Sequence, residues 1–489
     1  MKSARTNTGD RAHLLRQIGL GSGIAVVVGS TIGSGIFRSP SGIAEKLPSP
    51  TIMLAVWVVG GLFALCGALT LAEVGGAFPY SGGLYVYLRE AYGRVVGFLF
   101  AWAQLVLIRP ASTGAVAVVF GQYALRLGGA TDGSAGFDQK AAALAILAIM
   151  VVTVANVVGV RFGVGIQNLT TIAKTGGLLV LIVLAFALGL PKSGGHFSAT
   201  SSTGGISISM FGLALVSVLW AYDGWADGSY VGGEMVDARK NLPRSIILGT
   251  LAVIGVYLLA NFAYLSVLSV EQISKSSQIA ADVMSSLVGG WGVVFIVATV
   301  MISTLGTLNG SVLTSPRIFF ALAEDKMFFD WLGIVHPRFK TPYAAVIMTG
   351  VLGISYVLVA TALSGSKAFS SLTDAFVIGM VPFYALSVGS VFVFRRRESL
   401  RIGAPAEESD DSLVDAISVG ETTSHPHTYS PPVRTPLYPV VPLLFVCSTV
   451  YLLLNSLMDA GSRIPTLVTL GIVLLGMPVF YAVIARRAN

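Results

Sequence analysis

Two stretches of the chain place glycines and polar residues inside apolar segments, where lipid cannot satisfy an opened backbone. The first, V-G-S-T-I-G-S-G-I-F, covers residues 28–37, and the second, L-W-A-Y-D-G-W, covers residues 219–225. Each interior glycine disfavours a helix by about 1 kcal/mol, and unwinding a helix within a bilayer frees N–H and C=O groups that lipid cannot bond. The N–H groups of the following half-helix attract a carboxylate, and the freed carbonyls accept hydrogen bonds from an ammonium. The two breaks together therefore predict a binding site for an α-amino acid.

Close helix packing is the alternative explanation for these glycines, and it accounts for most isolated small-residue motifs in membrane helices. The breaks, however, fall in the first and the sixth predicted spans, and the second break contains Asp223 followed by Gly224. An odd number of spans in each half inverts the second half relative to the first, as in transporters that bind substrate between two broken helices. We therefore interpret the breaks as the substrate site of a transporter.

Two cations lie within predicted spans, where a charge is costly unless it is paired or functional. Lys174 stands in N-L-T-T-I-A-K-T-G-G. It lies only about ten positions into its span, so snorkelling to the membrane interface is the alternative to a functional role. Arg109 precedes Pro110, which has no N–H to donate. We expect neighbouring backbone carbonyls to bind the Arg109 guanidinium, and we expect its role to be structural.

The composition supplies the membrane-spanning elements that such a site requires. Hydrophobic residues make up 54% of the 489 residues and charged residues 11%, with a mean hydropathy of +0.78, whereas soluble proteins carry about 25% charged residues. A soluble enzyme is thereby excluded, and the continuous apolar runs exclude a transmembrane β-barrel. We expect an all-α polytopic membrane protein with 12 transmembrane helices. The predicted spans lie near 18–37, 51–73, 95–126, 141–158, 165–190, 207–231, 245–269, 288–322, 342–361, 370–394, 438–457 and 464–485.

The distribution of Lys and Arg orients these spans. Most of the 31 basic residues fall on the side of the membrane that holds both termini, which the positive-inside rule makes cytoplasmic. The net charge of +7 therefore follows topology and does not indicate nucleic acid binding. We expect a multi-pass protein of the cell membrane with this organisation: 1–17 cytoplasmic N-terminus, 18–190 first five-helix repeat, 207–394 second and inverted repeat, 395–437 disordered cytoplasmic loop rich in acidic residues and proline, and 438–485 two further helices.

Other functions lack the residues that they would need. No selectivity-filter sequence such as T-V-G-Y-G is present, which argues against a channel. All five histidines lie in predicted loops or tails, and Cys66 and Cys447 lie in separate apolar runs. Neither a metal site, a cofactor nor a disulfide framework is expected.

Several stretches between the first and ninth spans resemble one transporter family in their order and spacing. They are G-S-T-I-G-S-G-I-F (29–37), A-E-V-G (72–75), S-G-G-L-Y-V-Y (81–87), L-I-R-P-A-S (107–112), A-Y-D-G-W (221–225), G-E-M (233–235), N-L-P-R (241–244), L-N-G-S-V-L-T-S-P-R (308–317) and H-P-R-F-K-T-P (336–342). The chain resembles the light chains of the L-type heteromeric amino acid transporters and the bacterial serine/threonine exchangers, within the amino acid, polyamine and organocation superfamily. The resemblance implies a LeuT-type fold of five plus five inverted spans followed by two more.

The resemblance also assigns roles to residues at the two breaks. It implies that the carboxylate is held by Thr31, Gly33, Ser34 and Gly35, and the amine by carbonyls of Trp220, Ala221 and Asp223. Trp220 would be the gating aromatic, at a position where the light chains usually have Phe. The Asp223 carboxylate could pair with the amine or orient the freed backbone from outside the pocket, and we favour the orienting role. Lys174 would stand where sodium-coupled relatives bind a cation, so that its charge replaces the ion.

We therefore predict sodium-independent exchange of small to medium neutral L-amino acids by alternating access. The alternative is a proton-coupled symporter in which Lys174 titrates, because burial disfavours the charged form of a lysine. The expected partners are the amino acid substrate and the lipid bilayer. Mammalian light chains are linked to a heavy chain through a cysteine after the third span. The corresponding loop here, about 127–140, contains none, so no disulfide-linked heavy chain is expected.

Charged and aromatic residues also lie near the cytoplasmic ends of the spans. Glu73, Glu234 and Arg317 fall at such ends, where solvated side chains and gate-forming salt bridges are both common. The tyrosine-rich segment 79–94 is typical of an amphipathic helix at the membrane interface, next to the inner gate.

Overall fold

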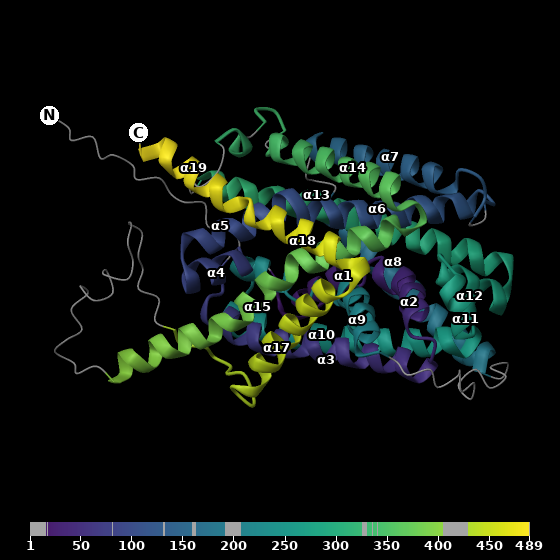
Figure 1. The fold of residues 1–489 in the computed structure, drawn as a ribbon, viewed down its shortest axis with the longest axis horizontal. Helices are drawn as coiled ribbons and strands as arrows, with labels where there is room; N and C mark the ends of the chain where they lie inside the picture. Colours follow the sequence, from purple (N-terminus) through teal and green to yellow (C-terminus); the bar gives the residue numbers. More distant parts are fainter. Residues whose placement is uncertain are drawn as a thin grey trace.

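The computed structural model describes residues 16, 18–80, 82–130, 133–158, 163–190, 207–324, 330–334, 336–339, 341–403 and 429–488. These residues form helices almost throughout (Figure 1). An isolated parallel bridge joins Ile18 to Met235, through hydrogen bonds from Ile18 N to Glu234 O and from Val236 N to Ile18 O, each 3.0 Å.

The helices overlap the predicted spans, but the first broken span ends at Lys46 instead of 37, the span predicted to begin at 245 begins at Ala238, and the span predicted to end at 394 continues to Gly403. The first half contains α1 (Leu20–Thr31), α2 (Gly35–Lys46), α3 (Pro50–Ala77), α4 (Leu84–Tyr92), α5 (Arg94–Ala103), the π-helical turn η1 (Gln104–Ile108), α6 (Arg109–Leu127), α7 (Phe137–Val158), α8 (Gly163–Leu184) and the π-helical turn η3 (Ala185–Gly189). The second half contains α9 (Ile208–Tyr222), the 3₁₀ segment η5 (Asp227–Glu234), α10 (Ala238–Val267), α11 (Val270–Lys275), α12 (Ile279–Val288), α13 (Gly290–Glu324), η6 (Asp330–Gly333), α14 (Tyr343–Ser364), η7 (Gly365–Lys367), α15 (Ala368–Gly403), α17 (Val440–Met458), α18 (Ala460–Leu474) and α19 (Gly476–Ala488).

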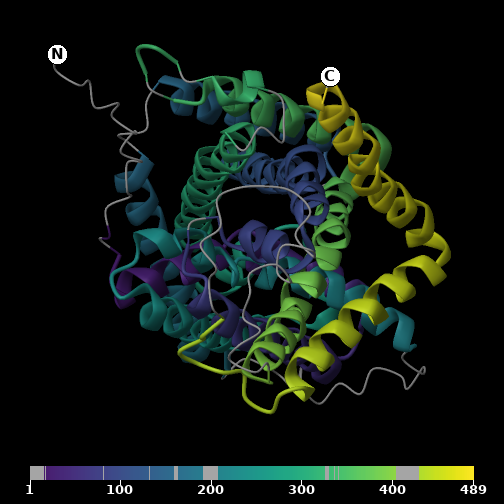
Figure 2. The same ribbon diagram turned by 90° about the vertical axis from the view of Figure 1, so that its left-hand side faces the viewer.

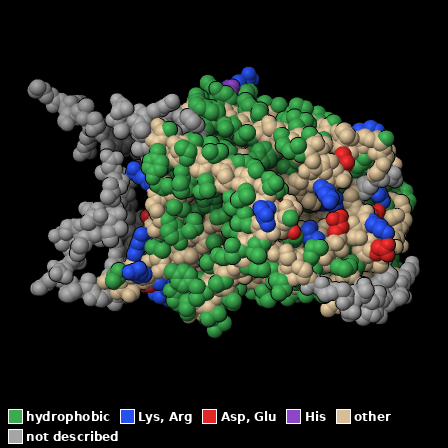
Figure 3. Space-filling model, in the orientation of Figure 1, with side chains coloured by type: hydrophobic (Ala, Val, Ile, Leu, Met, Phe, Trp, Pro, Cys, Tyr) green, Lys and Arg blue, Asp and Glu red, His purple; other side chains and the backbone are tan. Residues whose placement is uncertain are grey.

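The chain is an all-helical, multi-span membrane protein. Among the described residues, 10 helical stretches are long and apolar enough to cross a bilayer, or 11 when the bent pair α1 and α2 counts as one span. One of the 10 stretches, Tyr343–Leu400, is 58 residues long and holds two helices, α14 and α15, on either side of η7. A span needs about 20 residues, so this stretch has the length of two predicted spans. Apolar side chains cover much of the surface, and most charged ones lie toward its two ends (Figure 3).

Nine of the described helices form two packed groups. We call α1, α2, α3, α9 and α10 the bundle, because α10 packs on α1 and α3, and α9 packs on α2 and α3. We call α6, α7, α13 and α14 the scaffold, because α6 packs on the other three. The scaffold forms the upper layer and α3, α9 and α10 the lower layer in Figure 1. Helix α15 contacts both groups, and α17 to α19 lie on the outer flank (Figure 2).

The segment expected as a disordered loop over 395–437 differs from that expectation at both of its ends. Helix α15 continues to Gly403, and the chain from Tyr429 to Thr435 packs against the end of α3. The reason is a buried carboxylate, Glu73, that accepts hydrogen bonds from Arg395, Tyr429 and Thr435. Residues 404–428 lie outside the described part of the chain.

Candidate functional site

The two predicted breaks are real interruptions, and they lie against each other. Helices α1 and α2 meet at 43° around residues 32–34, and α9 ends before Gly224, whose φ is +115°. A Cβ atom at Gly35 would lie 2.6 Å from the Cα of Ala221, and one at Gly224 would lie 2.7 Å from the backbone N of Thr31. At each break a glycine lets the backbone contact the backbone of the other break, and we call this contact between the two breaks the crossing. A side chain in place of Gly35 or Gly224 would prevent the contact.

The start of α2 offers the donors expected for a carboxylate. In the described part of the chain, no backbone group accepts from the N–H of Ser34, Gly35 or Ile36, and such orphan groups carry the positive end of the helix dipole. The Ser34 hydroxyl is buried and also has no partner among the described residues. A Cβ atom at Gly33 would meet nothing closer than 3.9 Å, namely the carbonyl oxygen of Thr31. Of the predicted carboxylate ligands, Gly33 is the one that borders open space.

The carbonyl oxygen of Thr31 is itself engaged. It accepts a hydrogen bond of 2.7 Å from the Tyr257 hydroxyl of α10, and the Thr31 hydroxyl donates to Val27 O at 2.8 Å within α1. The first half-helix is thus fixed to α10 at the point where it ends. Sequence reasoning missed Tyr257, since nothing in an apolar helix marks which tyrosine reaches a break.

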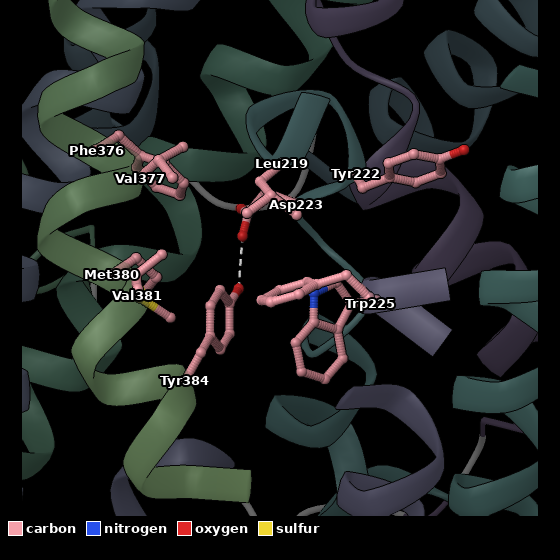
Figure 4. Close-up of a pocket in the computed structure, with 10 residues that line it drawn as sticks. Leu219, Tyr222, Asp223, Trp225, Phe376, Val377, Met380, Val381 and Tyr384 are labelled. Atoms are coloured by element: carbon pink, nitrogen blue, oxygen red, sulfur yellow. Dashed lines mark hydrogen bonds between the residues drawn. The ribbon is translucent and has the colours of Figure 1, made fainter. Parts of the chain in front are cut away.

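The Asp223 carboxylate at the end of α9 is bound by α15. Tyr384 donates a hydrogen bond of 2.5 Å to Asp223 Oδ1 (Figure 4). Next to this pair lies a cavity of about 20 Å³, lined by Phe63, Leu219, Tyr222, Asp223, Trp225, Phe376, Val377, Met380, Val381 and Tyr384. That volume accommodates about one water molecule. The contact with Tyr384 is compatible with the orienting role that we favour for Asp223.

Trp220 lies in an aromatic group between α9 and α15. Its side chain is buried, and its ring is perpendicular to the rings of Phe376 and Phe369, with centroids 4.9 and 6.3 Å away. The Arg38 guanidinium lies over Phe369, 5.6 Å from the ring centroid. These side chains pack together beside the crossing, next to α2 and the start of α15. Phe369, Phe376 and Arg38 were not predicted, because phenylalanine is common throughout the spans.

Lys174 lies behind the first break, in α8. The residue is 1% exposed, and its Nζ donates a 2.5 Å hydrogen bond to the carbonyl oxygen of Gly29, in the last turn of α1. No carboxylate of the described residues lies within ion-pair distance of it. The Lys174 ammonium therefore interacts with the negative end of the α1 half-helix and not with an acidic side chain. Because the residue is buried, the alternative that its side chain snorkels to the membrane interface is wrong.

Arg109 departs from the prediction. Its Nε donates to the side-chain oxygen of Gln104 at 3.0 Å, not to a backbone carbonyl. Its charge acts on Asp223 and on Asp227, which stands one turn further along in η5. Asp227, which sequence reasoning overlooked, also contacts the Ser30 hydroxyl at the end of α1. Its spacing of four positions from Asp223 was the feature of the sequence that could have identified Asp227 as a residue near the second break.

The predicted ligand residues, Thr31, Gly33, Ser34, Gly35, Trp220, Ala221 and Asp223, all lie at this one crossing. Lys174 contacts it from outside the pocket, through the end of α1. The arrangement places helix N–H donors on one side and a bound carboxylate on the other, which suits a zwitterion.

Comparisons with known proteins agree with this chemistry. Residues 18–478 match the family model described as amino acid permease. The serine/threonine exchanger SteT of Bacillus subtilis is 32% identical over 480 residues, covering 97% of this chain and 98% of that protein. The human b(0,+)-type amino acid transporter 1 is 30% identical, covering 81% and 79%, and the human Asc-type amino acid transporter 1 is 33% identical, covering 69% and 65%. The chain, a transporter and not an enzyme, therefore belongs to the amino acid permease family.

Proposed function

We propose that this protein is a sodium-independent exchanger of small to medium neutral L-amino acids, working by alternating access. The observation that carries the proposal is the contact between Lys174 Nζ and the carbonyl oxygen of Gly29. A fixed ammonium at the end of α1 supplies the positive charge that a coupling ion would otherwise bring to this place. Transport that needs no added ion is then driven by the substrate on the opposite side of the membrane.

The architecture that we propose has 12 spans, with five plus five inverted spans and two more. The bent pair α1 and α2 counts as one span, and α14 and α15 count as two. The bundle carries both breaks, and the scaffold carries neither. Rocking of the bundle against the scaffold would expose the crossing to each side of the membrane in turn.

The charge of the crossing and the aromatic side chains beside it support the proposed substrate class. The start of α2 suits a carboxylate, and the aromatic group around Trp220 limits the space above it. Small and medium side chains fit such a space better than large ones. The name of the Bacillus subtilis relative, a serine/threonine exchanger, supports the same size range.

Proton-coupled symport through Lys174 is the second candidate. Lys174 is buried and has no acidic partner among the described residues, so its charge is held only by backbone dipoles and could be lost within the transport cycle. In that case the same contact with Gly29 would form and break as the proton is bound and released.

Uptake of radiolabelled L-serine into proteoliposomes separates the two candidates. Under exchange, vesicles preloaded with unlabelled L-serine should take up many times more label than empty vesicles, with sodium replaced by choline and with no pH gradient. An imposed inward proton gradient should leave that exchange nearly unchanged. Net uptake into empty vesicles driven by the proton gradient would contradict exchange and support symport.

We further propose that the protein functions in the cell membrane without a disulfide-linked second subunit, with both termini cytoplasmic. Neither of its cysteines, Cys66 and Cys447, lies in the loop between α6 and α7. Reconstitution of the purified chain by itself should give full exchange. A requirement for an added subunit would contradict this view, and labelling of single cysteines placed at each terminus in intact cells would test the orientation.

A further inference from the structure

A groove lies between α8 and α13, in the part of each helix that is apolar enough to cross the membrane. Its volume is about 510 Å³, and it is lined by Ile172, Ala173, Gly176, Gly177, Val180, Val294, Phe295, Ala298, Thr299 and Ile302. The first five of these residues belong to the stretch Thr170–Gly189 and the other five to the stretch Gly290–Val312, both long and apolar enough to span a bilayer. The groove is separate from the crossing, because no residue of either break lines it.

Small residues form the floor of this groove. Gly177 and Thr299 are buried, and a Cβ atom at Gly177 would lie 2.3 Å from Cγ2 of Thr299, so the two helices are in direct contact there. A Cβ atom at the neighbouring Gly176 would meet nothing within 4 Å. Gly177 therefore lets α8 pack closely on α13, while Gly176 opens onto the groove.

Larger apolar side chains form the rim, and all of them are exposed: Ile172, Val180, Val294, Phe295 and Ile302. Because the spans that carry them cross the membrane, this exposed apolar surface faces lipid, and the groove continues that surface inward. None of the ten lining residues is charged. Their one hydroxyl, that of Thr299, donates to Phe295 O at 2.9 Å within α13. The lining thus leaves no polar side chain for a polar ligand to satisfy, and it suits a hydrocarbon.

A membrane helix, such as one from a second copy of this chain, is the alternative occupant. Helices in lipid meet through small residues that let their backbones approach closely. Here the small residues lie below a rim of large ones, of which Ile172 is 72% exposed and Phe295 42%. A helix about 10 Å wide would contact these rim side chains before it reached Gly176. A single hydrocarbon chain is thin enough to lie along the floor.

We propose that this groove binds an acyl chain of a bilayer phospholipid. Helix α8 contacts the first break on its other face: Lys174 Nζ bonds the carbonyl oxygen of Gly29, and a Cβ atom at Gly29 would lie 3.1 Å from the Thr171 side chain. At 3.6 residues per turn, Ala173, Gly176 and Val180 fall on the opposite face of the helix from Thr171 and Lys174. The bound acyl chain therefore packs against the outer side of the helix that holds the Lys174 ammonium at the end of α1.

The test is photolabelling of the purified full-length chain in nanodiscs that contain a phosphatidylcholine with a diazirine in the middle of one acyl chain. Mass spectrometry of peptides locates the label. In the wild type, the label on 172–180 and 294–302 should exceed that on the exposed face of α3, at Val58, Val59 and Leu62. Gly176→Leu should lose this excess, because its side chain enters open space and fills the groove. Ala298→Leu, which fills the groove from α13, should lose it as well.

Gly471→Leu is the matched control. Gly471 is also exposed, and a Cβ atom there also meets nothing within 4 Å, but the residue lies on α18, which packs on α15 and α17. This variant should keep the excess label, and all three variants should keep the unfolding midpoint of the wild type. Equal labelling of the groove and of α3 in the wild type, or an excess that survives both groove variants, would overturn the proposal. So would a wild-type dimer, seen by light scattering, that becomes a monomer in Gly176→Leu, because a second copy would then occupy the groove.

Discussion

The carboxylate of Glu73 on α3 and the guanidinium of Arg395 on α15 form a bidentate ion pair. Arg395 Nε lies 2.8 Å from Oε1, and Nη2 lies 2.7 Å from Oε2. The Glu73 side chain is 0% exposed, and it also accepts from Tyr429 Oη at 2.7 Å, Thr435 N at 2.6 Å and Thr435 Oγ1 at 2.7 Å. Burial and the Glu73 charge raise the pKa of Tyr429, which keeps its hydroxyl protonated as a donor. One carboxylate thereby ties the bundle to α15 and to the chain that leads into α17.

Glu73→Gln should destabilise the protein strongly. The change leaves the Arg395 guanidinium without a counter-charge, and breaking a buried pair in this way costs about 3–5 kcal/mol. The thermal unfolding midpoint of the purified protein measures it. Glu398→Gln is the control, because its partner Arg434 is 53% exposed and such a pair contributes less than about 1 kcal/mol. Equal midpoints for the two variants would show that Glu73 does not hold these elements together.

Gly33→Leu should abolish L-serine exchange while leaving the unfolding midpoint close to that of the wild type. A side chain there enters open space, since its Cβ would meet nothing closer than 3.9 Å, and it fills the approach to the N–H groups of α2. Gly35→Leu should lower both exchange and the midpoint, because its Cβ would collide with the backbone of Ala221. Normal exchange by Gly33→Leu would remove the carboxylate from this break. The pair of variants thus separates loss of binding from loss of the crossing.

Trp220→Ala should weaken the apparent affinity for L-serine by about tenfold, or about 1.4 kcal/mol, and should admit larger amino acids. The indole packs on Phe376 and Phe369. As the proposed gating aromatic it would close over the substrate, and small substrates would depend most on that closure. Competition by a panel of L-amino acids against labelled L-serine measures the change. Trp102→Ala is the control, since Trp102 bonds Ile472 O at the periphery. An unchanged substrate panel would mean that Trp220 only packs the core.

Lys174→Ala should reduce exchange at least tenfold, because the end of α1 loses the charge that positions it. Exchange into preloaded proteoliposomes is the measurement. Lys46→Ala is a matched control: Lys46 Nζ also bonds a helix carbonyl, Gly42 O at 3.1 Å, but near the end of α2 and away from the breaks. That variant should exchange normally. Wild-type rates in Lys174→Ala would refute the idea that the ammonium replaces a coupling ion.

The sequence allowed prediction of the features that are costly in a membrane. Gly33, Gly35 and Gly224 were recognisable because glycine disfavours a helix. Lys174 was recognisable because a charge within a span is costly unless it is paired or functional. The partners of these residues could not be predicted. Tyr384 and Phe376 lie in an apolar helix more than 150 positions from Asp223 and Trp220, and no local pattern distinguishes them from other core aromatics.

In the acid-rich segment 395–437, the composition failed to predict structure that is present. Its composition predicted disorder throughout 395–437, because polar and proline-rich segments bury little apolar surface. The composition of a loop does not show that a carboxylate elsewhere, Glu73, supplies hydrogen-bond acceptors for Tyr429 and Thr435. The described residues Tyr429 and Thr435 of this segment are held by Glu73, in the case of Thr435 across 362 positions of sequence, so only the folded arrangement reveals their position.

The parallel bridge between Ile18 and Met235 has a practical consequence for handling the protein. The chain that enters α1 and the chain that leaves η5 share two backbone hydrogen bonds of 3.0 Å, so one cannot be displaced without pulling the other or breaking both bonds. A load attached near residue 18 would therefore act on both broken spans at once. Affinity tags and fluorescent reporters belong after α19, on the outer flank of the molecule, where they leave the two half-helices free to move.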